Sequence, residues 1–248
     1  MSGSLVVVGT GPGKAELMTP ATQAAIAKAT DLVGYGPYLD RIPAMKAGQC
    51  RHASDNRVEL DRARHALSLA AAGRDVVVVS GGDPGVFAMA AAVFEAVEVG
   101  DPAWRTLDIR VEPGVTAMLA AAAEVGAPLG GDFCAISLSD NLKSWSTIER
   151  RLKAAAHGDF VIALYNPASK ARPRQLAEAF VLLRSVKDAA TPVLFVRAAG
   201  TSEAKVVSTT LGMADGSMAD MRTLVIIGAS TTRQVGRWIY TPRRERGA

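Results

Sequence analysis

Two glycine-rich segments of this 248-residue chain could bring a ligand against the backbone. The first covers residues 9–14 (GTGPGK) and follows a short apolar run, and the second covers residues 80–86 (SGGDPGV) and follows four consecutive valines. Because glycine has no side chain, a ligand can lie directly on the peptide groups of such loops. Both segments therefore indicate binding of a small molecule through backbone groups.

The first segment fits neither of two phosphate-binding motifs that it resembles in outline. The dinucleotide motif requires a glycine where this chain has Lys14, and an acidic residue at the end of the second strand, whereas Asp31 stands at the beginning of that strand. The P-loop requires a glycine where this chain has Val8. Pro12 also removes an N–H group that would hold a phosphate. The turn therefore suits an uncharged or bulky ligand, or it is a tight turn without a ligand.

The second segment places an aspartate directly after two glycines. Because Pro84 suits the first position of a helix, the sequence predicts a helix over 84–99 with Asp83 as its N-cap. The edge formed by Gly81, Gly82 and Asp83 can also accept hydrogen bonds from N–H or hydroxyl groups of a ligand. The two interpretations are compatible, and both stay open.

Short β-branched runs alternate with helical patterns along the chain, which predicts an α/β fold. A Pro-Gly break at 112–114 separates the halves, so the predicted domains are 1–114 and 115–248. The expected strands cover 5–8, 31–33, 76–79, 107–111, 133–138, 160–164, 193–196, 205–210 and 224–227, with the last two antiparallel. The expected helices include one from Pro20 behind a Thr19 cap, one that ends at Gly73 and has Ala63, Ala66, Leu67 and Ala70 on its buried face, and others over 84–99, 116–125, 147–156 and 172–186. Ligands of such folds bind at the carboxyl ends of the strands, where both glycine segments lie.

Composition excludes several classes of protein. The net charge is +4, and no dense basic stripe with interleaved aromatic residues is present, so no nucleic-acid partner is expected. The longest apolar runs are too short to span a bilayer, so no membrane association is expected. Two cysteines and three histidines show no metal-ligand spacing, so we predict no protein-bound metal. The absence of a secretory signal favours a cytoplasmic protein.

The joint pattern of motifs resembles the tetrapyrrole methylase family. The first segment, the Gly81–Pro84 motif and a third motif at 113–117 (PGVTA) occur in the family's order and spacing over the whole chain. The resemblance implies two consecutive α/β domains with S-adenosyl-L-methionine bound in a cleft between them, S-adenosyl-L-homocysteine as product, and a homodimer.

Finer motifs resemble the branch of the family that methylates C17 of precorrin-3B. They lie at 34–40 (GYGPYLD), at 137–140 (SLSD) and at 163–167 (ALYNP). This branch couples methylation to ring contraction, which gives precorrin-4 in cobalamin biosynthesis. A cobalt-carrying substrate or another corrin-ring methylase is the alternative within the family. From other classes, a dinucleotide-dependent oxidoreductase is disfavoured by Lys14, and a non-catalytic tetrapyrrole-binding protein stays open.

The resemblance also implies which residues contact the ligands. The cofactor contacts it implies are Pro12, Gly81, Gly82, Asp83, Val86, Thr116, Ala117, Tyr165, Asn166, Ala199 and Thr223. Ring contraction moves protons, and the candidates for that role are Tyr35, Tyr38, Ser139 and Asp140. The alternative roles are turn packing for the two tyrosines and helix capping for Ser139 and Asp140.

The substrate of such an enzyme is a polycarboxylate tetrapyrrole. Basic side chains that could pair with its carboxylates follow the branch motifs, at Lys143, Lys170, Arg172 and Arg174. The alternative role for each of them is that of an ordinary solvated surface residue.

Overall fold

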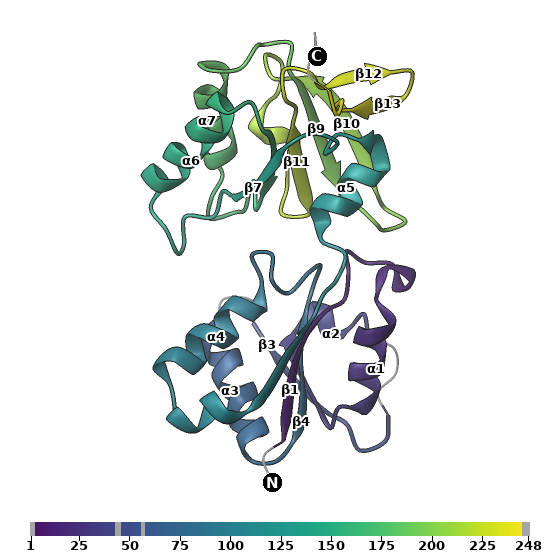
Figure 1. The fold of residues 1–248 in the computed structure, drawn as a ribbon, viewed down its shortest axis with the longest axis vertical. Helices are drawn as coiled ribbons and strands as arrows, with labels where there is room; N and C mark the ends of the chain where they lie inside the picture. The colour runs from purple at the N-terminus through teal and green to yellow at the C-terminus, as the bar shows by residue number, and fades with distance from the viewer. Residues whose placement is uncertain (1–2, 43–45, 56–57, 245–248) are drawn as a thin grey trace. The chain divides into compact units, whose positions relative to one another are not determined.

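The computed structural model describes residues 3–42, 46–55 and 58–244 and divides the chain into two compact units, Met1–Ala117 and Met118–Ala248 (Figure 1). The division falls between Ala117 and Met118, close to the Pro-Gly break that the sequence marks. Both units combine helices with a five-stranded sheet, so the predicted α/β class is confirmed. No helix in the described ranges has the length and apolar character needed to cross a membrane.

The first unit is built on a parallel sheet in the order β3-β2-β4-β1-β5. Its elements are β1 (Ser4–Gly9), η1 (Ala15–Leu17), α1 (Pro20–Lys28), β2 (Asp31–Tyr35), α2 (Gly36–Leu39), β3 (Cys50–Ser54), α3 (Glu59–Ala71), β4 (Asp75–Ser80), α4 (Met89–Val99), η2 (Pro102–Thr106) and β5 (Asp108–Glu112). Helices α3 and α4 cover one face of the sheet, and α1 and α2 cover the other (Figure 1).

The two faces of this sheet explain the runs of valine in the sequence. Val76 and Val78 of β4 pack with α3 and α4, whereas Val77 and Val79 pack with α1 and Leu39 of α2. A parallel strand that is covered on both faces needs apolar residues at every position. The predicted cap of α1 is confirmed as well, because the Thr19 hydroxyl accepts a hydrogen bond from the Thr22 N–H at 3.2 Å.

The second unit contains a mixed sheet in the order β10-β9-β11-β8-β7 and a small sheet in the order β12-β13-β6. Its elements are α5 (Ala117–Val125, whose first residue belongs to the first unit), β6 (Gly126–Ala127), β7 (Phe133–Ser137), α6 (Trp145–His157), β8 (Val161–Tyr165), α7 (Gln175–Arg184), β9 (Pro192–Arg197), β10 (Lys205–Thr210), η3 (Gly216–Met218), β11 (Thr223–Ile227), β12 (Arg233–Val235) and β13 (Trp238–Tyr240). The late strands β10 and β11 flank β9 and are each antiparallel to it, so they run in the same direction and are not the antiparallel pair that was predicted.

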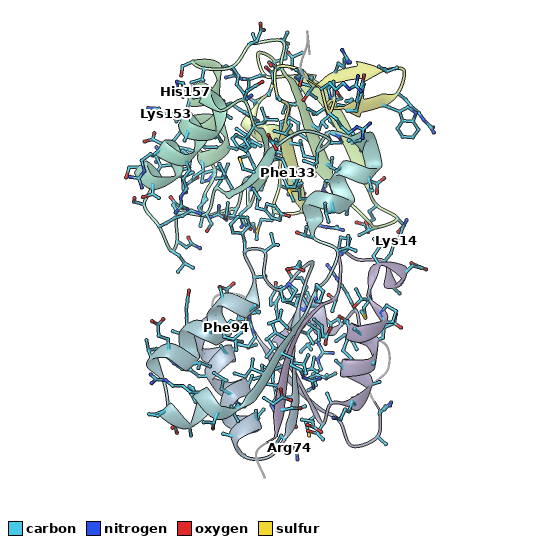
Figure 2. The ribbon with its side chains drawn as sticks, in the orientation of Figure 1. Lys14, Arg74, Phe94, Phe133, Lys153 and His157 are labelled. Atoms are coloured by element: carbon cyan, nitrogen blue, oxygen red, sulfur yellow. The ribbon has the colours of Figure 1, made fainter. Side chains whose placement is uncertain are left out.

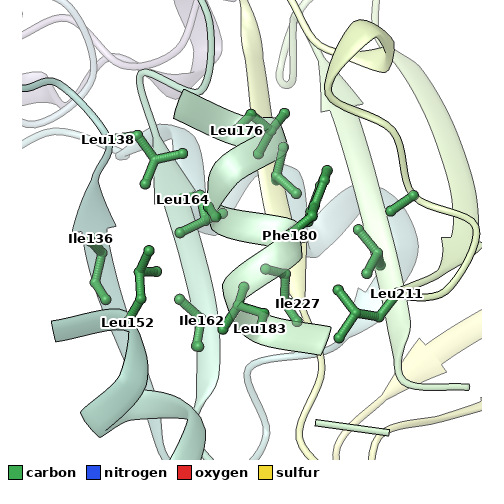
Figure 3. Close-up of a cluster of buried hydrophobic side chains, with 14 of the residues drawn as sticks. Ile136, Leu138, Leu152, Ile162, Leu164, Leu176, Phe180, Leu183, Leu211 and Ile227 are labelled. Atoms are coloured by element: carbon green, nitrogen blue, oxygen red, sulfur yellow. The ribbon is translucent and has the colours of Figure 1, made fainter. Parts of the chain in front are cut away.

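The core of the second unit lies between this mixed sheet and helices α6 and α7 (Figure 3). Phe180 of α7 is 1% exposed and meets Phe195 of β9 edge-on, with ring centroids 6.0 Å apart. Leu164 of β8 and Leu138, just after β7, are fully buried in the same cluster. This apolar packing fixes the ends of β7 and β8, where two of the sequence motifs begin.

Two features of the first unit differ from the prediction. The helix expected from Pro84 begins only at Met89, and Phe87 has a left-handed backbone with φ of 53°. Strand β3 was not predicted, because its sequence (CRHAS) contains polar residues where a strand signal needs β-branched ones.

Asp31, at the amino end of β2, is buried and joins several elements of the first unit. Its carboxylate accepts hydrogen bonds from Arg74 Nε and the Thr30 hydroxyl, both at 2.7 Å, and lies 2.9 Å from His52 Nε2. Figure 2 labels Arg74 near the amino ends of the strands and Lys14 at the opposite end of the same unit. Asp31 is therefore a structural residue at the edge of the sheet away from the glycine loops.

We expect Asp31→Asn to lower the free energy of unfolding by about 2 kcal/mol at pH 7. Burial alone would raise the pKa of Asp31, but the hydrogen bonds from Arg74, Thr30 and His52 outweigh it and lower the pKa from 3.8 to about 2. A carboxylate with a lowered pKa stabilises the fold above its unfolded pKa, so the difference between variant and parent should shrink only as the pH falls from about 4 towards 2.

Denaturant unfolding between pH 7 and pH 3 measures this difference. The control is Asp61→Asn, since Asp61 is an exposed partner of Arg64 and should change the free energy of unfolding by less than about 0.5 kcal/mol. Equal effects of the two variants at pH 7 would contradict the prediction.

Candidate ligand-binding site

Three loops of the first unit meet at the carboxyl ends of neighbouring strands. The loops follow β1, β4 and β5, and β1 lies between the other two in the sheet. They contain the two glycine-rich segments and the motif at 113–117. The structure therefore brings the three motifs together at the edge of the sheet where open α/β folds bind ligands.

Backbone hydrogen bonds join the first two loops. Gly11 and Gly82 exchange a pair of them, with N–H to O distances of 3.1 and 2.8 Å. Both glycines have a left-handed backbone, with φ of 73° and 66°. Side chains rarely tolerate this conformation, so glycine at these two positions is explained by the shape of the turns.

The third loop packs directly on the other two through glycine. A Cβ atom at Gly114 would lie 2.2 Å from the carbonyl oxygen of Gly82 and 2.9 Å from the Cα of Gly9. A Cβ at Gly9 would lie 2.5 Å from the same oxygen. Gly9 and Gly114 are thus required because backbone packs against backbone.

The second glycine loop lies next to the Thr116-Ala117 pair. A Cβ at Gly82 would fit without a clash, in ordinary van der Waals contact with the Cα of Thr116 at 3.8 Å and the N of Ala117 at 3.9 Å. Thr116 is buried, Ala117 begins α5, and Pro12 and Val86 are half-buried in the first and the second glycine segment. The second glycine loop and the Thr116-Ala117 pair are therefore close enough to contact the same ligand.

Asp83 uses its carboxylate within the loops. One oxygen accepts a hydrogen bond from the Gly85 N–H at 2.8 Å, and the other accepts one from the Gly114 N–H at 3.0 Å. The expectation that Asp83 caps a helix is wrong, because residues 84–88 are not helical and Val86 lies before the helix. The carboxylate instead links the second loop to the third.

Tyr38, in the short helix α2 that follows β2, packs its ring against the second loop. Its ring is so close to Gly81 that a Cβ there would be 2.8 Å from Cζ. Tyr35 meets this ring edge-on at 5.4 Å, and the Arg41 guanidinium lies over it at the same distance. Burial raises the pKa of the Tyr38 phenol, with a partial offset from Arg41. Tyr38 therefore stays protonated at neutral pH, and its hydroxyl can donate a hydrogen bond.

The site residues predicted in the second unit gather along one edge of its mixed sheet. The motifs at 137–140 and 163–167 follow or end the parallel neighbours β7 and β8. Ala199 follows β9, and Thr223 begins β11, which runs antiparallel to both β8 and β9. This orientation places the ends of β7, β8 and β9 and the start of β11 at the same edge.

Ser137 organises the turns after β7 and β8. It belongs to the motif at 137–140 but was not predicted as a site residue. Its buried hydroxyl oxygen accepts hydrogen bonds from Asn166 Nδ2 at 2.9 Å and from the Ser139 N–H at 3.3 Å. Asn166 has a left-handed backbone with φ of 52°. A serine at the carboxyl end of a buried strand was the available signal.

The helix-capping role considered for Ser139 and Asp140 is wrong. Helix α6 is capped by Ser144, whose hydroxyl accepts a hydrogen bond from the Thr147 N–H at 3.3 Å. Asp140 instead accepts one from Gln175 Nε2 at 3.0 Å. Asp140 thus connects the loop after β7 to the start of α7.

Ala199 and Thr223 are both buried. The Thr223 hydroxyl donates to Asp220 Oδ1 at 2.8 Å and accepts from the Asp220 N–H at 3.0 Å. The described contacts of Thr223 therefore hold the turn before β11.

The four basic residues lie in the loops that follow β7 and β8. Arg172 donates from Nη1 to the carbonyl of Asn166 at 2.9 Å, whereas Arg174 is largely exposed and lies 3.9 Å from Glu178. Lys170 is exposed. Lys143 is half-buried, and its burial together with the nearby Arg151 lowers its pKa.

These observations describe an α/β protein whose three glycine loops pack together at strand ends, which is where open α/β folds bind small molecules. The chain belongs to the tetrapyrrole (corrin/porphyrin) methylase family, whose model matches residues 4–215.

Individual relatives match all or nearly all of the chain. It is 59% identical to a precorrin-3B C(17)-methyltransferase from Sinorhizobium sp over an alignment of 253 positions, which covers 100% of this chain and 99% of the relative. It is 42% identical to a probable cobalt-factor III C(17)-methyltransferase from Salmonella typhimurium, covering 96% and 98%. The crystal structure of the methyltransferase CobJ matches with a TM-score of 0.95 and 55% identity, covering 97% of this chain and 100% of that one.

Proposed function

We propose that this protein transfers a methyl group from S-adenosyl-L-methionine to C17 of precorrin-3B, with ring contraction to precorrin-4 in cobalamin biosynthesis. The observation that carries this proposal is the 59% identity to a precorrin-3B C(17)-methyltransferase over the full length of both chains. The three interleaved glycine loops supply a site for the methyl donor, and the loops after β7 and β8 supply groups for a second reactant.

The chemistry of the first unit fits the methyl donor. When bound, S-adenosyl-L-methionine supplies an electrophilic methyl group on a sulfonium centre. The second glycine loop, together with Thr116 and Ala117 beside it, offers peptide groups and small side chains to an adenosine, and Pro12 and Val86 add apolar surface. We assign the remaining donor contacts to Gly81, Asn166, Ala199 and Thr223, and place Asp83 and Tyr165 in this site through the chain segments that their side chains hold.

The contribution of the protein to the transfer is chiefly positional. Holding two reactants in line can supply roughly 7–11 kcal/mol of the barrier. Ring contraction also requires proton transfer, and we propose Tyr38 as the proton donor because its phenol is protonated and its ring lies against Gly81 of the second glycine loop. Tyr35, Ser139 and Asp140 are the further candidates for proton transfer.

The substrate carboxylates are proposed to pair with Lys143, Lys170, Arg172 and Arg174. We expect Lys143→Met to raise KM for the tetrapyrrole roughly tenfold with a smaller change in kcat, because a half-buried ammonium is weakly screened by solvent. Since burial and Arg151 lower the pKa of Lys143, this charge is lost at a lower pH than that of an ordinary lysine. The difference between parent and variant should therefore narrow as the pH rises.

Steady-state kinetics between pH 7 and pH 10 test this role, with Lys153→Met on α6 as the exposed control. A tenfold rise in KM for the control as well, or an unchanged KM for Lys143→Met, would contradict the assignment.

The activity is tested by incubating the protein with S-adenosyl-L-methionine and metal-free precorrin-3B under anaerobic conditions. Gain of one methyl group with a shifted absorbance spectrum is the expected result, and acetic acid released in later processing would report ring contraction. Turnover only of the cobalt-carrying substrate would assign the protein to the activity named for the Salmonella relative. Tetrapyrrole binding without turnover of either would indicate a non-catalytic binding protein.

We further propose that the protein works as a cytoplasmic homodimer. This proposal rests on the family resemblance alone, and sedimentation equilibrium at micromolar concentration tests the dimer.

A further inference from the structure

Asp83 and Tyr165 each hold one end of the segment that joins the two compact units. Both residues belong to the set that the family resemblance implies for the cofactor site. We call residues 114–118 the connector. At one end, the Gly114 N–H donates to Oδ2 of Asp83 at 3.0 Å, within the first unit. At the other end, the Met118 N–H donates to Oη of Tyr165 at 3.0 Å, within the second unit.

The bond at the Asp83 end is the stronger of the two. A carboxylate acceptor gives shorter and stronger hydrogen bonds than a neutral one. The second oxygen of Asp83 is also engaged, by the Gly85 N–H at 2.8 Å, so the carboxylate is oriented from both sides. Gly114 itself lies against Gly9 and Gly82, which leaves it little room to move.

The bond at the Tyr165 end satisfies a helix terminus. Met118 is the second residue of α5, and the first N–H groups of a helix have no partner within the helix. Tyr165 ends β8 and is paired in register with Ser137 of β7, so the sheet fixes the backbone that carries its ring. The phenol oxygen therefore ties the start of α5 to the sheet.

We infer that Asp83 and Tyr165 are positioning residues that fix the connector, and that they act on the methyl donor through residues 115–117 and not by direct contact. This inference rests on the proposed function. Its physical basis is that Thr116 and Ala117 lie next to Gly82, so any displacement of the connector changes the packing beside the second glycine loop. A misplacement of about 1 Å can cost about 100-fold in rate even when the chemical groups are intact.

The test uses hydrogen exchange of the ligand-free protein together with calorimetric binding of S-adenosyl-L-homocysteine. In Asp83→Asn the single amide oxygen cannot serve both N–H groups, and in Tyr165→Phe the Met118 N–H loses its acceptor. We expect amide exchange of the connector to rise roughly tenfold in each variant, and affinity for S-adenosyl-L-homocysteine to fall roughly tenfold. The double variant should lose less than the product of the two losses, since both release the same segment.

Matched controls exist for both variants. Asp101 accepts a hydrogen bond from the Ala103 N–H at 2.8 Å, the same local bond that Asp83 makes to Gly85, and Tyr240 accepts one from Arg233 Nε at 2.8 Å. Asp101→Asn and Tyr240→Phe should leave both connector exchange and binding unchanged.

Two outcomes would overturn the inference. Connector exchange that does not rise in either variant would show that these bonds do not hold the segment. Lost affinity with unchanged exchange would show that the two side chains touch the ligand directly. Failure of the parent protein to bind S-adenosyl-L-homocysteine, with exchange rising as expected, would instead overturn the proposed function and with it the action of the connector on the methyl donor.

Discussion

Gly114→Ala should reduce the affinity for S-adenosyl-L-homocysteine about 100-fold, although it adds only one methyl group. The new Cβ would lie 2.2 Å from the Gly82 carbonyl oxygen and 2.9 Å from backbone atoms of Gly9. All of these neighbours are main-chain atoms that cannot rotate away, so the three loops must move apart. The packing of the second glycine loop against Thr116 and Ala117 would then change. The free energy of unfolding of the first unit should fall by about 1–3 kcal/mol.

Isothermal titration calorimetry and thermal unfolding measure the two effects of this substitution. Gly36→Ala, in the same unit, is the control, because a Cβ at Gly36 would meet nothing within 4 Å. Unchanged affinity and unchanged unfolding temperature in Gly114→Ala would show that the loops are not packed backbone against backbone.

Phe180→Ala should lower the free energy of unfolding by about 3–5 kcal/mol, the largest loss of stability that we expect from any substitution considered. Phe180 is 1% exposed, meets Phe195 edge-on and belongs to the cluster that fixes the ends of β7 and β8. Its removal deletes buried apolar area and leaves a cavity between α7 and the sheet. The Arg184 guanidinium, 5.9 Å from the ring centroid, would also lose its aromatic partner.

Urea unfolding followed by circular dichroism gives this quantity. Val181→Ala, on the same helix and 67% exposed, is the control and should change the free energy of unfolding by less than about 0.5 kcal/mol. A loss below about 1 kcal/mol in Phe180→Ala would mean that this part of the core collapses around the missing ring.

The regular elements were predictable because their signals are local. Val76–Val79 are apolar at every position, which indicates a strand covered on both faces, and Ala63, Ala66, Leu67 and Ala70 follow the helical period of one buried face. The glycine motifs could be assigned to strand ends for the same reason. Their assembly at β4, β1 and β5 follows from the strand order, which local patterns do not reveal.

The unpredicted features depend on partners that are distant in sequence. Asp83 followed by proline has the local signature of a helix cap, but its carboxylate is bound by the Gly114 N–H, 31 residues away. Strand β3 has a polar sequence because its side chains meet polar partners: Ser54 accepts from Arg62, and His52 lies 3.0 Å from His65. Tyr165 was assigned to the cofactor by resemblance, and nothing in its neighbourhood in the sequence indicates that its hydroxyl accepts from Met118.

The strand order of the first unit has a consequence for how the chain folds. Strand β1 is made first, yet its two neighbours in the sheet are β4 and β5, which pair Ser4 with Asp75 and with Asp108. Such pairings close long loops, and folding is slow where contacts are distant in sequence. During synthesis, β1 can pair with β4 only after residue 80 has been made, and its other edge stays unpaired until β5 is complete at residue 112. In a shorter chain Leu5–Val8, which are buried in the folded unit, lack a neighbour on that side, and unpaired strand edges favour aggregation.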